Sequence, residues 1–242
     1  MLTLFASPHG LSLTSQALLA RAYELPVYVT DLEQKTALLD LVAAAEADAS
    51  PPAWPDCSDA LCRRWSLIAT TRASGSAALQ KMEQQPALGR FGVAQDWRKT
   101  GDGELRCENV ITIERPDDGL LSAWTLLPAG GQSSLKLLHK ARVVSEGQPL
   151  RITIELDAVV LDGNRKAGDE AEIIAQAPFP PRLIPNVPPP QLPIPGLKEA
   201  VEEAGTFDVT VLDESDDVEK LLVARSARGE VRVFAWAQDV NV

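Results

Sequence analysis

Short segments in which apolar and polar residues alternate recur along most of the chain, and this recurrence limits the folds open to it. Sequences rich in Gly, Pro, Asp or Gln separate many of the segments, at residues 101–103, 116–119, 129–131 and 146–149. Extended segments are predicted at residues 65–71, 91–97, 105–113, 120–127, 135–144, 150–161, 207–211, 221–225 and 231–236. About nine strands with almost no intervening helix favour a mainly β fold, an antiparallel barrel, over a parallel α/β sheet; a β-sandwich is the alternative.

The last three segments form an antiparallel meander that also carries a family pattern. Residues 211–214 read VLDE, residues 222–225 read LVAR, and Gly229 precedes a final apolar strand. This pattern resembles the C-terminal signature of the plastid lipid-associated proteins, the PAP/fibrillin family. The sequence departs from the usual form at Ser226, where Gly commonly follows the Arg, and in the extra acidic residues 216–217.

The resemblance implies a lipocalin-like β-barrel that binds a hydrophobic molecule. It implies ligands of the fatty acid, carotenoid or prenylquinone class and a chloroplast location, at plastoglobules or thylakoids. The Trp-containing segment at 65–71 is similar to the opening strand of that family. We expect Arg225 to pack on Trp65 as a cation–π lock of the barrel. The candidates for ligand binding or barrel locking are Trp65, Trp124, Asp213, Arg225 and Phe234.

The N-terminal part of the chain is interpreted as two regions. Residues 1–28 are interpreted as a transit peptide or a disordered N-terminus, because residues 1–23 contain no acidic side chain although the chain is acidic overall. The barrel domain is expected at residues 29–242, with strands between 65 and 237. A helix is predicted at residues 31–47, capped by Thr30 or Asp31. Its apolar stripe is expected along Leu32, Leu39, Val42 and Glu46, with Leu38 and Leu41 adjacent.

Three further features concern the middle of the chain. A short helix is predicted at residues 77–85 and a helical turn at 197–204. In the segment 150–161 the apolar parity changes, so a bend is predicted near residues 157–158. Residues 177–196 hold nine of the eighteen prolines among apolar residues, which predicts a stiff Pro-rich strap laid over the barrel.

Few residues suggest catalytic or metal chemistry. His139 lies in a predicted strand near Lys136, Lys140 and Arg142 and is expected at the surface. The cysteines, at positions 57, 62 and 107, lack zinc-site spacing, and their odd number favours a reducing compartment. We therefore expect no catalytic residue, no metal and no cofactor.

The charge balance bears on the partners. With 34 acidic against 23 basic residues the net charge is −11, which opposes binding to nucleic acid or to anionic lipid surfaces. Because no catalytic residues are in evidence, the expected function is non-enzymatic binding, and the resemblance implies a hydrophobic small molecule or lipid with contact to a peripheral membrane or lipid-body surface. The alternative is a structural protein that coats lipid bodies or docks a protein partner, an enzyme of isoprenoid metabolism, without an internal ligand.

Overall fold

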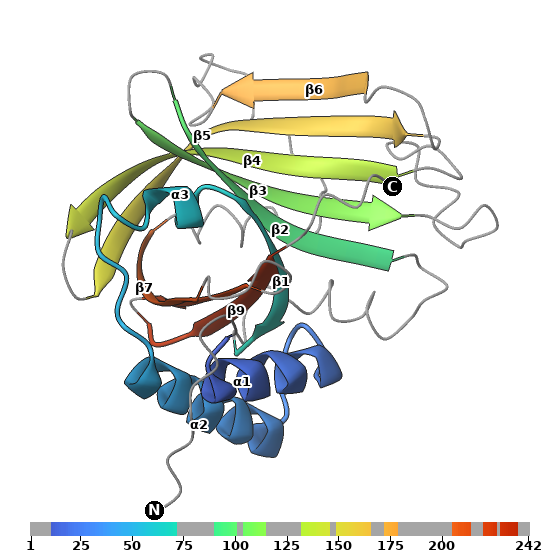
Figure 1. Ribbon diagram of the computed structural model, residues 1–242. Coiled ribbons are helices and arrows are strands. Elements are labelled where there is room, and N and C mark those ends of the chain that lie inside the picture. The colour runs from blue at the N-terminus through green and yellow to red at the C-terminus, as the bar shows by residue number, and fades with distance from the viewer. Residues whose placement is uncertain are drawn as a thin grey trace, which may run out of the picture. The chain divides into compact units, whose positions relative to one another are not determined.

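The structure, a computed structural model, describes residues 11–71, 90–100, 104–114, 132–145, 149–165, 172–178, 205–213, 220–226 and 228–236. Within these it contains the helices α1 (Leu13–Glu24), α2 (Leu32–Asp48) and α3 (Ser58–Leu61). The strands are β1 (Arg64–Thr70), β2 (Arg90–Lys99), β3 (Leu105–Glu114), β4 (Gln132–Ser145), β5 (Leu150–Arg165), β6 (Glu172–Pro178), β7 (Thr206–Asp213), β8 (Leu221–Ser226) and β9 (Val231–Trp236) (Figure 1). In the described part of the chain, no helix has the length and apolar character needed to cross a membrane.

The predicted fold class is confirmed at the level of a mainly β, antiparallel protein. The pairs β1–β9, β2–β3, β3–β4, β5–β6, β7–β8 and β8–β9 are all antiparallel. The predicted helix at 77–85, the strand at 120–127 with Trp124, and the helical turn at 197–204 lie outside the described residues.

The chain divides into two compact units. The first contains the three helices, β1, β7, β8 and β9, with the last residues of β4 and the first residues of β5. The second contains β2, β3 and β6 with the larger parts of β4 and β5.

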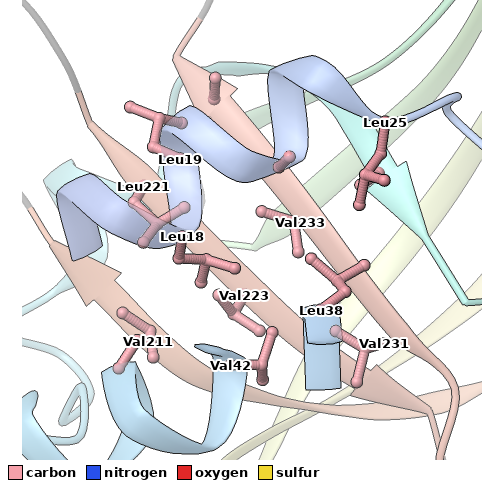
Figure 2. Packing of buried hydrophobic residues seen from close by; sticks show 14 of the residues in the cluster. Leu18, Leu19, Leu25, Leu38, Val42, Val211, Leu221, Val223, Val231 and Val233 are labelled. Atoms are coloured by element: carbon pink, nitrogen blue, oxygen red, sulfur yellow. The ribbon is translucent and has the colours of Figure 1, made fainter. Parts of the chain in front are cut away.

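In the first unit, α1 and α2 pack side by side on one face of the strands (Figure 1). Leucines of both helices, among them Leu18 and Leu38, lie over Val223 and Val233 in a common buried cluster (Figure 2). Burying one such side chain fully stabilises a fold by about 1.5–3 kcal/mol. The strand side chains in this cluster define the helix-covered face, which consists of Ala69, Val211, Leu221, Val223, Val231, Val233 and Ala235.

The helix α1 was not predicted from the sequence, although it falls within the segment interpreted as a transit peptide or disordered N-terminus. It begins after Ser12, whose hydroxyl accepts a hydrogen bond of 3.1 Å from the Ser15 amide. Its Leu18, Leu19 and Ala22 are buried in the cluster with the strands. Residues 13–24 are thus part of the core of the first unit.

The predicted helix at 31–47 is confirmed as α2, and Asp31 is its N-cap, accepting from the Gln34 amide at 2.9 Å. The predicted apolar stripe was partly wrong. The buried positions are Leu38, Val42 and Ala45, whereas Leu32 is 78% exposed at the first turn. The reason is that spacings of four and three residues keep these three side chains on one face, and Leu32 lies outside it.

In the second unit, β2, β3 and β4 form an antiparallel meander in unbroken register. Strand β5 continues the sequence-predicted segment at 150–161, but its buried residues keep even numbers on both sides of the predicted bend, from Leu150 to Leu156 and again at Val160, with Ala158 half-buried between them. The bend predicted at residues 157–158 is therefore wrong; the register with β6 shifts later, between Leu161 and Asp162. Strand β6 was not predicted, and it includes Ala177 and Pro178, the first two residues of the predicted strap. Residues 179–196 lie outside the described part of the chain.

Candidate functional site

Four of the five candidate residues from the sequence lie in the first unit, on two different faces of its strands. Trp65 stands opposite Trp236, and Phe234 stands opposite Leu222, so Trp65 and Phe234 share the face away from the helices. Both side chains are buried, at 0% and 1% exposure. Asp213 and Arg225 lie on the helix-covered face, and Trp124 is outside the described residues.

The expected contact between Arg225 and Trp65 is therefore wrong. Trp65 is in register with Trp236, but Arg225 is in register with Val231, five residues back along β9. At roughly 3.4 Å per residue the two positions are some 17 Å apart along that strand. Side-chain alternation also directs them to opposite faces, since they differ in parity relative to β9.

Each of these residues has another partner. The Arg225 guanidinium donates to both carboxylate oxygens of Glu46 on α2, at 2.6 and 2.8 Å, and this hydrogen bonding raises the pKa of Arg225. The indole Nε1 of Trp65 donates to the carbonyl of Leu61 on α3 at 3.0 Å. The Asp213 carboxylate accepts from the Ser12 amide at 3.4 Å. Arg225 and Asp213 therefore tie the two helical elements to the strands.

A second set of polar side chains, which the sequence analysis did not assemble, lies on one face of β2, β3 and β4. The register places Trp97, Cys107 and His139 in one row across the three strands. The next row holds Gln95, Asn109 and Leu137 on the same face. We call the polar members of these two rows, Gln95, Trp97, Cys107, Asn109 and His139, the polar row.

Apolar side chains surround the polar row. On β4, Leu135 and Ala141 share the parity of His139 and are buried. On β5, the ion pairs Lys140–Asp157 and Arg142–Glu155, at 3.4 and 3.9 Å, mark the outward face. Residues of the other parity, Ile154 and Leu156, are buried at 3% and 4% exposure. The polar row is thus set in a mostly apolar wall.

The hydrogen bonds of the polar row lead from Trp97 through Gln95 to Asn109. The Trp97 indole Nε1 can only donate, and it lies 3.3 Å from the Gln95 side chain, which must present its oxygen Oε1 there. The Gln95 amide nitrogen then donates to Asn109 Oδ1 at 2.9 Å. Cys107 Sγ also lies 4.0 Å from this oxygen. These bonds direct the Asn109 amide nitrogen elsewhere, where its N–H groups can donate to another molecule.

His139 completes the polar row and carries its most unusual atom. Its side chain is 2% exposed, so the expectation of a surface position is wrong. Lys136, Lys140 and Arg142 are even-numbered and point to the other face of β4, which the alternation could have revealed. The ring Nδ1 lies 3.3 Å from the carbonyl oxygen of Cys107, and a carbonyl only accepts, so Nδ1 carries the proton.

The remaining nitrogen of His139, Nε2, is consequently an acceptor. It is the one buried side-chain nitrogen or oxygen in the described residues that has no hydrogen-bond partner. Burial lowers the pKa of His139, against the opposing effect of the carbonyl groups of Cys107 and Leu137. The neutral ring therefore presents a lone pair to an apolar wall, an arrangement that costs free energy unless a donor is bound.

The polar row can hydrogen-bond to a polar group of another molecule. It offers an acceptor at His139 and amide donors at Asn109, which together match a group such as a hydroxyl. The described residues contain no cluster of three or more His, Cys, Asp or Glu side chains able to hold a metal ion. The contact between His139 and Cys107 runs from the imidazole Nδ1 to the backbone carbonyl of Cys107.

Comparisons with known proteins give no relative from which a function could be transferred. No family model matches the chain, no curated protein matches it, and no solved structure matches it.

Proposed function

We propose that this protein binds a hydrophobic small molecule without changing it chemically, and that the polar row holds the polar group of that molecule. The observation that carries the proposal is the buried, unpartnered Nε2 of His139 among apolar side chains. Apolar contact supplies the affinity, at roughly 25 cal/mol per Å² removed from water, and the polar row sets the orientation.

The site chemistry narrows the ligand within the classes that the PAP/fibrillin resemblance suggests. A neutral imidazole acceptor on β4 and an amide donor one row away on β3 suit a hydroxyl group, which both donates and accepts. Among fatty acids, carotenoids and prenylquinones, this favours the quinol form of a prenylquinone, a hydroxylated carotenoid or a protonated fatty acid. An ionised carboxylate has no proton to donate to Nε2.

The proposal includes a lipocalin-like barrel and a plastid location, at plastoglobules or thylakoids. The antiparallel meanders of both units support the barrel, because closed antiparallel sheets leave no exposed edges and can enclose one small apolar ligand. The family resemblance at residues 211–214 and 222–225 supports the location.

A second candidate, contact with a lipid-body surface or a protein partner without an internal ligand, is favoured by a different observation. Three large apolar side chains on the helices are strongly exposed: Leu13 at 69%, Tyr23 at 61% and Leu32 at 78%. If this candidate is correct, the Leu13→Gln/Leu32→Gln variant should no longer float with lipid bodies in a flotation assay, whereas His139 variants should still do so.

The test of the proposed function is native mass spectrometry, with lipid extraction, of the full chain purified from its own source. We expect one apolar molecule per chain in the parent. The His139→Phe variant, which keeps an aromatic ring but removes the acceptor, should lose most of it. Lys140→Gln, on the outward face of the same strand, is the matched control and should retain the ligand. A parent protein that carries no apolar molecule, and binds none added, would contradict the proposal.

A further inference from the structure

Two cationic side chains share the ring of Trp236 at the end of β9, in the first unit. The Lys220 Nζ lies 4.9 Å from the ring centroid, and the Arg63 Cζ lies 5.6 Å from it. Both distances are within the range of a cation–π contact. Two cations therefore meet at one ring, although the chain has a net charge of −11 and residues 213–219 before Lys220 are mostly acidic.

The strand pairings bring these three residues together. Trp236 is in register with Trp65, and Arg63 lies two residues before Trp65. On β8, the other neighbour of β9, Leu221 is in register with Ala235, so Lys220 comes opposite Trp236. The backbone amide of Trp236 donates to the Lys220 carbonyl at 3.1 Å. Arg63 Nε lies 3.4 Å from the backbone carbonyl of Asp59 on α3. The backbone therefore sets the positions from which both cations reach the ring.

Lys220 differs from two other cations of this unit, the half-buried Arg225 and the exposed Arg151, which both pair with a carboxylate. Arg225 pairs with Glu46 at 2.6 Å and Arg151 pairs with Asp208 at 2.7 Å. Lys220 is only 7% exposed, yet its ammonium has no carboxylate partner among the described residues. A charged amine on a mostly buried side chain gains by pairing with an anion.

The ammonium is nevertheless within reach of a solute. His139 Nε2 is the one fully buried side-chain nitrogen or oxygen in the described residues without a hydrogen bond. The Lys220 Nζ, which makes no side-chain hydrogen bond there, is therefore not completely buried, although the side chain as a whole is. The Trp236 ring beside it is partly exposed.

We propose that Lys220, Arg63 and Trp236 form a binding site for an oxyanion, a carboxylate or a phosphate group. The ammonium of Lys220 and the guanidinium of Arg63 supply charge-assisted hydrogen bonds, and the indole ring fixes both cations beside the anion. This site is in the first unit and is independent of the ligand proposed at His139.

The test follows the indole N–H signal of Trp236 by NMR, in the full chain, during titration with octanoate and separately with inorganic phosphate. The signal is assigned with the Trp236→Phe variant. We expect a saturable shift with at least one of the two anions. A shift with octanoate alone identifies the ligand as an organic carboxylate, and a shift with phosphate alone identifies it as a phosphate group. Shifts in both titrations identify an oxyanion site without further selectivity.

Variants distinguish a specific anion site from a general effect of charge on the Trp236 signal. Lys220→Met should weaken the binding at least about tenfold, and Lys220→Arg should keep it within about threefold, because a charge-assisted bond is restored. Lys140→Met, the same loss of charge at an exposed lysine, should bind like the parent. The NMR signal of the Trp65 indole N–H should be unchanged in Lys220→Met, which would show that this variant is folded like the parent. No saturable shift with either anion, an equal shift with sodium chloride at matched ionic strength, or unchanged binding by Lys220→Met would overturn the proposal.

Discussion

Glu46 on α2 accepts two hydrogen bonds from the Arg225 guanidinium on β8, at 2.6 and 2.8 Å, and so links a helix to a strand 179 residues further along the chain. The two side chains are 22% and 30% exposed. The pair lies at the edge of the helix-covered face, where Val42 and Ala45 are buried. It therefore helps to hold α2 on the strands.

Breaking this pair should destabilise the protein. Arg225→Met or Glu46→Gln alone should lower the free energy of unfolding by about 1–2 kcal/mol, because each leaves a half-buried group without its partner. The double variant should cost less than the sum of the two. Urea unfolding gives these values. The control is the exposed pair Arg142–Glu155, at 3.9 Å, whose coupling should be close to zero; an equal coupling there would refute the role assigned to Glu46.

The packed α1 helix predicts a second result. Leu18→Ala should lower the free energy of unfolding by about 2–5 kcal/mol, because Leu18 is completely buried in the helix–strand cluster. Leu13→Ala on the same helix should change it by less than about 0.5 kcal/mol, since Leu13 is 69% exposed. Similar small effects of both variants would mean that α1 is not part of the folded core.

The hydrogen bond between Trp97 and Gln95 predicts a third result. Gln95→Leu should destabilise the protein by about 1–3 kcal/mol, because the buried Trp97 indole loses an acceptor. In the Gln95→Leu background, Trp97→Phe removes the donor that has lost its acceptor. Trp97→Phe should therefore lower the free energy of unfolding less in that background than in the parent. Thermal and urea unfolding of the four proteins in this cycle measure the difference. Strict additivity would contradict the donor chain described for the polar row.

The lowered pKa of His139 predicts a pH dependence of stability. In the unfolded chain His139 titrates near its ordinary pKa of about 6.5, whereas burial keeps it neutral to lower pH in the folded protein. As the pH falls below about 6.5, protonation of His139 therefore favours the unfolded state, and the free energy of unfolding decreases. The urea midpoint should fall more between pH 7.5 and pH 5.5 in the parent than in His139→Leu. Equal falls would show that His139 does not titrate differently in the two states.

The sequence predicted those elements whose signals are local. The Asp31 cap and the Ala- and Leu-rich composition identified α2 with its ends nearly in place. Residues 97 and 107 are equally distant from Asp102, so the turn at 101–103 held enough information to pair Trp97 with Cys107. That part of the polar row was within reach of the sequence.

The rest depended on relationships that are not local. Residues 115–131 separate β3 from β4 in the sequence, and this separation is too long to predict the register that brings His139 beside Cys107. The expected contact between Arg225 and Trp65 was wrong because it came from analogy and ignored the residue parity across two strand pairs, β8–β9 and β9–β1. Helix α1 has no acidic residue in its first turn, so it lacked a strong start signal, and its burial against the strands decides its structure.

The central claim is that His139 Nε2 accepts a hydrogen bond from a bound hydrophobic molecule. The most direct measurement compares the affinities of a short-tailed prenylquinone in its quinol and quinone forms, under anaerobic conditions, for the parent and for His139→Phe. We predict that the parent binds the quinol about tenfold more tightly, since only the quinol has a proton to donate, and that the variant loses this preference. An unchanged preference in His139→Phe, or no binding of either form to the parent, would contradict the account.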